Sequence, residues 1–135
     1  MNSPAADLQK ALFSRLNGDA TLVAILGGQK VFDQAPDKTA FPYVTFGRTS
    51  IFDWSTGTES GTEQLCTLHI WSNAKGKKEA FEITAAMRAR LDQAPLELSA
   101  HHLVNFRFEF AEVLFEEDQA VYHGLLRFRA VIEDI

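Results

Sequence analysis

Two stretches near the end of the chain alternate apolar and polar residues, and this alternation constrains the fold more than any other feature. The apolar members are Val104, Phe106, Phe108 and Phe110 in the first stretch and Leu126, Phe128, Ala130 and Ile132 in the second. Because successive side chains of a strand point to opposite faces, each stretch predicts a strand with one apolar face. Residues 115–120 between them lack an apolar period and include three consecutive acidic residues, so we expect a solvated hairpin tip.

Three further strands are predicted in the first half of the chain. Residues 30–33 favour a brief strand, and residues 41–48 favour a longer one whose start Pro42 places at a sheet edge. Residues 62–71 predict a strand with both faces partly apolar. Such a strand is covered either by helices on one side and a neighbouring subunit on the other, or by a core that lies wholly within the chain. Residues 49–61 predict a long hairpin connection.

Helical patterns account for most of the remaining chain. Residues 4–16 and 74–91 each carry apolar residues at helical spacing, which predicts two amphipathic helices. A shorter helix is expected after Asp19, a residue type that caps the first turn, and before the glycine pair at residues 27–28, which favours a helix end. The polar pair at residues 72–73, Ser and Asn, is the predicted cap of the last helix.

Together these elements predict an α+β fold, an antiparallel-rich β-sheet of about four to five strands with two main helices packed on one face. The chain has 135 residues, of which 46% are hydrophobic and 23% are charged. A chain of this length can bury about two-thirds of its unfolded surface, so we expect a single domain over residues 1–135. The 11 Phe residues supply large apolar areas to its core or to an interface.

Charge and cysteine content exclude several classes of protein. The formal net charge of -5 gives no global positive field to hold nucleic acid, so direct DNA binding is not expected. Cys66 is the single cysteine, which allows no intrachain disulfide and favours a reducing compartment. The sequence shows no signal-peptide pattern, and no apolar stretch approaches the roughly 20 residues of a membrane span. These features predict a protein of the cytoplasm that does not enter a membrane.

No set of residues in the sequence indicates catalysis, a metal site or a bound cofactor. His69 and His123 fall within predicted strands. The adjacent histidines at residues 101–102 would point to opposite faces of a strand, so they cannot easily share one ion. We therefore expect ordinary surface or interface histidines. The basic residues 75–78 lack the rest of a phosphate-binding loop and predict a solvated helix start or a rim contact.

The remaining nucleophilic and acidic groups have structural interpretations. Cys66 lies within an apolar strand and is expected to be an inert core thiol. Glu116, Glu117 and Asp118 are consecutive carboxylates on a predicted hairpin tip, which differs from the fixed geometry of an acid–base pair. The sequence therefore predicts a protein that is not an enzyme and binds no cofactor or metal.

A set of short segments forms a characteristic combination along the chain. The segments are Val31-Phe32-Asp33 followed by Ala35-Pro36, Phe41-Pro42-Tyr43-Val44, Asp53-Trp54-Ser55-Thr56, Leu68-His69-Ile70-Trp71-Ser72 and Tyr122-His123-Gly124. Their order and content resemble the tail-terminator, or tail-completion, family of long-tailed phages and phage-derived gene transfer agents. The resemblance extends from the first predicted helix to the last predicted strand.

The resemblance implies a structural protein that forms a ring, usually of six subunits, on the head-proximal end of the tail tube. Such a ring ends polymerisation of the tail tube protein and offers a docking surface to the head-side stopper or connector protein. DNA would pass through it without specific binding, since an acidic lining repels the phosphate backbone. The resemblance further implies assembly in the bacterial cytoplasm and a final place at the head–tail junction of a phage or gene-transfer-agent particle.

The connection at residues 51–61 is the candidate for contact with the tail tube or with a neighbouring subunit. The residues expected to make this contact are Phe52, Asp53, Trp54, Thr56 and Thr58. Aromatic side chains contribute about 2 kcal/mol or more when they lie at the centre of an interface. The alternative is that Phe52 and Trp54 fold back onto their own sheet.

Two other functions are alternatives to the tail terminator. A head-completion stopper or another ring protein of the same particle would share the composition, acidity and aromatic loops, and its stoichiometry and position in the particle would distinguish it. A small-molecule-binding or enzymatic α+β domain would require convergent polar groups in an apolar pocket, whereas the sequence offers only scattered histidines.

Overall fold

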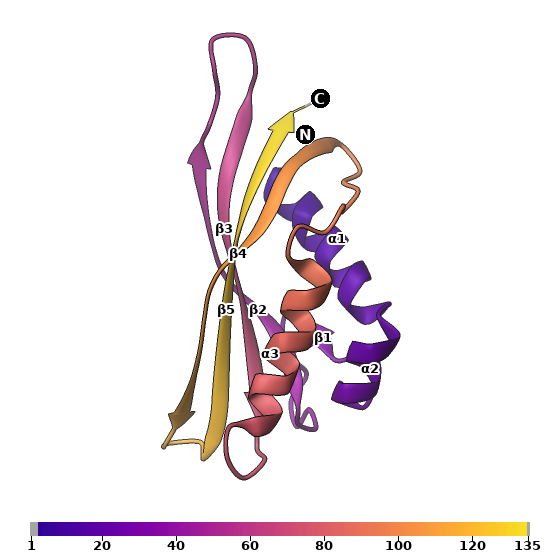
Figure 1. The fold of residues 1–135 in the computed structure, drawn as a ribbon, viewed down its shortest axis with the longest axis vertical. Coiled ribbons are helices and arrows are strands. Elements are labelled where there is room, and N and C mark those ends of the chain that lie inside the picture. The colour runs from indigo at the N-terminus through magenta and orange to yellow at the C-terminus, as the bar shows by residue number, and fades with distance from the viewer. Residues whose placement is uncertain (1–2, 135) are drawn as a thin grey trace.

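One five-stranded sheet and three helices make up residues 3–134, the part of the chain that the computed structural model describes (Figure 1). In chain order the elements are α1 (Pro4–Asn17), α2 (Ala20–Leu26), β1 (Val31–Phe32), β2 (Tyr43–Asp53), β3 (Gly61–Ser72), α3 (Lys78–Leu91), β4 (His101–Glu116) and β5 (Val121–Asp134). The strand order is β1-β2-β3-β5-β4, and only the β1–β2 pair of these strands is parallel. The predicted α+β fold class is therefore confirmed. Met1, Asn2 and Ile135, which the single-domain prediction includes, lie outside the described residues.

The helices of the described part lie on one face of the sheet, as the sequence predicts (Figure 1). The central strands turn Leu68, Ile70, Leu126 and Phe128 toward this layer, and each of these side chains is fully buried. We call the opposite side of the sheet the outer face. Within residues 3–134 no helix packs across the outer face, so many of its side chains remain only partly buried.

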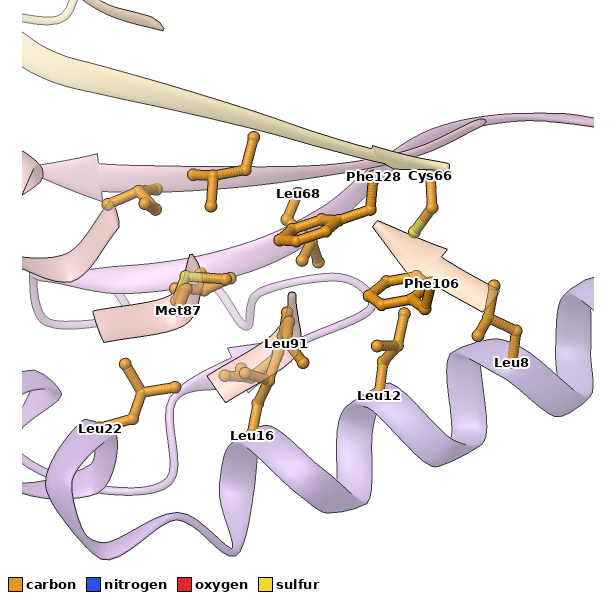
Figure 2. Close-up of a cluster of buried hydrophobic side chains, with 14 of the residues drawn as sticks. Leu8, Leu12, Leu16, Leu22, Cys66, Leu68, Met87, Leu91, Phe106 and Phe128 are labelled. Atoms are coloured by element: carbon orange, nitrogen blue, oxygen red, sulfur yellow. The ribbon is translucent and has the colours of Figure 1, made fainter. Parts of the chain in front are cut away.

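The hydrophobic core fills the space between the sheet and the helices. The helices contribute Leu8, Leu12, Leu16, Leu22, Met87 and Leu91 (Figure 2). From the sheet, Phe106 and Phe128 stack with ring centroids 4.9 Å apart. Burying each large apolar side chain contributes about 1.5–3 kcal/mol, so the helical spacing of the leucines determines which face of α1 meets the sheet.

Local capping interactions explain why the first two helices begin and end where the sequence predicts. Ser3 and Asp19 accept hydrogen bonds from the backbone N–H groups of Ala6 and Leu22. At the C-terminal end of α2, Gly27 adopts a φ of 80°, a left-handed conformation that strains other residues.

Helix α3 begins later than the sequence predicts. Ser72 and Asn73 are not its caps, because the helix begins at Lys78 and has no side-chain cap hydrogen bond. The Ser72 hydroxyl instead donates to the Glu79 carboxylate at 2.6 Å. Gly76 has a φ of 88°, so the chain makes a turn before the helix starts.

The β2–β3 hairpin has longer strands and a shorter loop than predicted. β2 continues to Asp53 and β3 begins at Gly61. The connection therefore spans residues 54–60 instead of residues 49–61. A register shift after Phe46 interrupts the alternation of β2, which is why the sequence pattern places the strand end too early.

The prediction that Pro42 places the start of this strand at a sheet edge is wrong. β1 pairs in parallel with Val44 and Thr45, while β3 pairs with the same two residues from the other side. Pro42 precedes the first residue of β2, so its missing N–H removes no hydrogen bond from the sheet.

A register shift in β4 also changes which aromatic side chains share a face. The shift lies between Phe108 and Phe110. Phe108 packs edge-on against Phe128 on the helix side, with ring centroids 5.9 Å apart. Phe110 turns to the outer face, where the Arg127 guanidinium lies 5.1 Å from its ring centroid. The common apolar face predicted for residues 104–110 is therefore broken, because one extra residue reverses the alternation.

A buried carboxylate–imidazole contact joins α1 to the start of β4. The Asp7 carboxylate accepts hydrogen bonds from the backbone N–H groups of Ser99 and Ala100, at 2.8 and 2.9 Å, and lies 2.8 Å from Nδ1 of His101. His101 is therefore buried, contrary to the expectation of a surface or interface histidine. Burial alone raises the pKa of the Asp7 carboxyl, but the hydrogen bonds from His101, Ala100 and Ser99 outweigh it and lower the pKa to about 2.

We expect Asp7→Asn to lower the free energy of unfolding by about 1–3 kcal/mol at neutral pH, because a neutral amide replaces a buried hydrogen-bonded carboxylate. The folded-state pKa lies below the ordinary value of 3.8, so the advantage of the wild type is complete above pH 3.8 and is lost as the pH falls toward about 2. Urea unfolding of both proteins at neutral and acidic pH measures this difference. A gap of the same size near pH 2 would contradict the assignment to the Asp7 carboxylate.

Candidate functional site

The β2–β3 hairpin extends beyond the helix layer (Figure 1). It carries exposed apolar side chains at its end. Ile51, Phe52 and Trp54 are 54%, 48% and 46% exposed. We call residues 51–61, which include these side chains and the loop, the hairpin arm. Neighbouring large apolar side chains that remain in solvent are typical of an interaction site.

Hydrogen bonds accepted by short polar side chains hold the loop of the hairpin arm in one shape. Asp53 Oδ1 accepts from the backbone N–H and the hydroxyl of Ser55, at 3.3 and 2.7 Å. The Thr56 hydroxyl oxygen accepts from the backbone N–H groups of Thr58 and Glu59, at 3.3 and 3.1 Å. These are the side-chain turns that Asp and Thr form in loops, and they order the loop from within.

The five residues predicted to contact a partner all lie on the hairpin arm, but in different structural roles. Phe52 and Trp54 present exposed aromatic surface. Asp53 and Thr56 form the hydrogen bonds that shape the loop. Thr58 is exposed and donates its backbone N–H to Thr56. The geometry thus separates two residues with apolar contact surface from residues that hold that surface in place.

Trp54 lies partly over the start of β3. Its backbone N–H donates to the carbonyl oxygen of Gly61 at 2.9 Å, and its ring carbon Cε3 is 3.7 Å from the position that a Cβ on Gly61 would take. The indole nevertheless remains 46% exposed. Trp54 therefore packs partly against the start of β3 and leaves nearly half of its surface exposed to solvent.

Carboxylates gather beside the loop of the hairpin arm. A hydrogen bond to Glu133, together with the negative charge of that residue, raises the pKa of Glu59. The backbone N–H of Asp134 donates to the carbonyl oxygen of Ser60 at 3.0 Å, which joins the end of β5 to the loop. The hairpin arm therefore combines aromatic surface with negative charge, a combination suited to a partner with an apolar patch and a basic rim.

A row of aromatic rings crosses the outer face of the sheet. Tyr43 of β2 stacks on Trp71 of β3 with ring centroids 6.5 Å apart. Trp71 in turn lies nearly parallel to the ring of His123 in β5, with centroids 4.1 Å apart. The indole N–H of Trp71 donates to the Thr45 hydroxyl at 3.0 Å. These contacts connect three strands on a face that the helices leave uncovered.

Two histidines that the sequence presents as independent are joined on this face. Nδ1 of His69 lies 2.6 Å from Nε2 of His123, and Nδ1 of His123 lies 2.9 Å from Oε1 of Glu116. Glu116 belongs to β4, so the predicted hairpin tip narrows to residues 117–120. The alternation of residues along each strand places each histidine on the less apolar face of that strand. It does not predict that the two histidines meet, because the register between two strands is not encoded in a local sequence pattern.

The described residues offer no arrangement suited to metal binding. Among residues 3–134, no three His, Cys, Asp or Glu side chains are grouped so that they could hold a metal ion. Cys66 is buried in the core, and burial raises the pKa of its thiol to about 12, so the thiol stays protonated as expected. The described helices include none that is long and apolar enough to cross a membrane.

Comparisons with known proteins identify the family. The model of the tail completion protein gp17 family matches residues 10–133. The tail completion protein gp17 of Bacillus phage SPP1 is 24% identical over 127 residues, which cover 94% of this chain and 92% of that protein. A chain in the solved structure of the virion of a native gene transfer agent particle has a TM-score of 0.90 and 30% identity, covering 98% of this chain and 99% of that chain. The resemblance inferred from the sequence is confirmed, and the chain belongs to the tail completion protein gp17 family.

Proposed function

We propose that this chain forms a ring of six subunits that caps the head-proximal end of a tail tube and ends its polymerisation. Membership in the tail completion protein gp17 family supports a structural role in a phage-type tail. The observation that carries the proposal is the similarity, with a TM-score of 0.90 over 98% of this chain, to a chain of the gene transfer agent virion. Because nearly the whole of both chains is matched, the likeness concerns the entire fold and not one shared motif.

The uncovered outer face supports contact between subunits of the ring. The helices cover one face of the sheet (Figure 1). The outer face keeps partly exposed aromatic rings that a neighbouring copy can cover. A contact between different surfaces of identical chains closes into a ring when the rotation between neighbours permits it. The partly apolar outer side of β3 fits a sheet that lies between its own helices and another subunit.

The hairpin arm is the surface that we propose contacts the tube or the adjacent subunit. A tube end exposes edges and loops that recruit further tube subunits, so a terminator must cover them and present a different surface on its other side. Phe52 and Trp54 supply exposed aromatic area for this contact. The hydrogen bonds of Asp53 and Thr56 order the loop beforehand, which reduces the conformational entropy lost on docking.

The opposite side of the ring is proposed to dock the head-side stopper or connector protein, while DNA passes through the centre without specific binding. The net charge of -5 supports this passage, because negative charge does not adhere to the phosphate backbone. Assembly in the bacterial cytoplasm would place the finished ring at the head–tail junction of the particle.

Electron microscopy of particles assembled with and without this chain tests the proposal. Without it we expect overlong tails that lack heads, because tube polymerisation is not stopped and the head has no docking surface. Adding the chain back should restore tails of normal length that carry heads. Normal-length tails joined to heads in its absence would contradict the proposal, and normal-length tails without heads would instead indicate a head-completion stopper.

We expect Trp54→Ala to weaken binding of the ring to the tube, or of one subunit to the next, by about 30-fold or more, since a central aromatic anchor contributes about 2 kcal/mol or more. The matched control is Phe81→Ala, which removes a 55% exposed aromatic ring from α3, outside the hairpin arm. Sedimentation measures ring formation, and electron microscopy measures tube capping. If the Trp54 variant assembles and caps tubes as well as the Phe81 variant does, the hairpin arm is not the contact surface.

A further inference from the structure

Three side chains on the outer face form a hydrogen-bonded chain that crosses three strands. Nδ1 of His69 in β3 lies 2.6 Å from Nε2 of His123 in β5, and Nδ1 of His123 lies 2.9 Å from the Glu116 carboxylate in β4. An ionised carboxylate only accepts hydrogen bonds, so Nδ1 of His123 carries the proton of that bond. In the neutral form of His123, Nε2 is therefore unprotonated and accepts the Nδ1 proton of His69. Both histidines are neutral in this arrangement, and Nε2 of His69 is the nitrogen left to accept another proton.

The surrounding packing holds both rings in these positions. A Cβ added to Gly47 of β2 would overlap the ring of His69, so a glycine at this point leaves room for that ring. The ring of Trp71 lies only 7° from parallel to the ring of His123. The side chain of His123 is 13% exposed. The hydrogen-bonded chain is therefore part of a packed layer and not a chance contact of two mobile side chains.

We propose that His69, His123 and Glu116 form a proton-binding site that holds one added proton and is opened by a second. The first proton enters at Nε2 of His69, and the resulting imidazolium continues to donate its Nδ1–H to His123. The second proton has to enter at Nε2 of His123, the atom that accepts this hydrogen bond. Two cations would then meet with an N–H aimed at an N–H, so the rings must separate and the stack with Trp71 must change. This site belongs to the single chain and does not depend on the proposed ring.

Charged side chains next to the site act in opposite directions. Arg48 of β2 and Arg127 of β5 line a groove beside His69 and disfavour added positive charge there. Glu112 of β4 lines the same groove, and its carboxylate favours added positive charge on the histidines. Glu116 at the end of the hydrogen-bonded chain has the same effect. Burial of the ring lowers the pKa of His69.

The lowered pKa of His69 determines how the stability of the fold changes with pH. Because the folded-state pKa of His69 lies below the ordinary 6.5, the unfolded chain binds the proton first. The stability that neutral His69 contributes is complete above pH 6.5 and is lost as the pH falls from there toward the folded-state pKa.

Nitrogen NMR of the imidazole rings in the full chain, recorded across pH, tests the proposal, with the indole N–H of Trp71 as a second readout. We expect His69 and His123 to titrate in two steps more than about one pH unit apart. Above both steps each ring should carry its proton on Nδ1. The Trp71 resonance should shift at the lower step, where the rings separate. A single common step, or two steps without a shift of Trp71, would overturn the proposal.

Two variants and a control distinguish the site from a general effect of acid. His69→Gln should leave His123 with one titration step. Gly47→Ala keeps both histidines but displaces the ring of His69, so it should also abolish the two-step behaviour. His102→Gln removes an exposed histidine that is not part of the hydrogen-bonded site, so this control should preserve both titration steps. If His69→Gln still shows the lower, Trp71-linked step, the site is refuted, even where the Gly47 variant does not fold.

Discussion

The uninterrupted pairing of β3 with β5 is the constraint on which the rest of the structure depends. Each residue of β3 has a partner in β5, and no register shift occurs along the pair. Alternate residues of both strands therefore stay on the same face over their whole length. This one register turns Leu68 and Phe128 toward the helices and His69 and His123 toward the outer face. The hydrophobic core, the aromatic row and the histidine pair are all consequences of it.

The flanking strands are irregular where the central pair is regular, and their irregularities produce much of the distinctive surface. The shift after Phe46 places Gly47 under the ring of His69. The shift before Phe110 moves an aromatic ring from the helix side of β4 to the outer face. Bulges also make an exposed edge strand a poorer template for unwanted pairing. The central strands therefore hold one register along their length, and the bulged strands change which side chains the sheet presents to other molecules.

Local patterns in the sequence were sufficient to predict the elements, because their causes act within one helical turn or one strand. Asp19 caps α2 as predicted, whereas Ser72 has the same chemistry but hydrogen-bonds a side chain and caps no helix. The contact between His69 and His123 joins residues 54 positions apart, and no local pattern specifies that register. The sequence predicts the position of the β2–β3 hairpin correctly but makes its strands too short, because a bulge interrupts the alternation of β2. The family could be predicted from the sequence because the resemblance rests on the order of several segments along the whole chain and not on one local pattern.

A protein whose work is geometric requires surfaces in a fixed spatial relation more than it requires a pocket. The hairpin arm and the outer face are both carried by β2 and β3, which pair from Tyr43 to Asp53 with a single interruption. If the outer face meets a neighbouring subunit and the hairpin arm meets the tube, the distance between the two contacts is set by a hydrogen-bonded hairpin and not by a flexible linker. The side-chain hydrogen bonds of Asp53 and Thr56 extend this order to the end of the arm. In the proposed ring of six subunits, the arms would then meet the tube at equal height, which is the property that a flat cap on a tube needs.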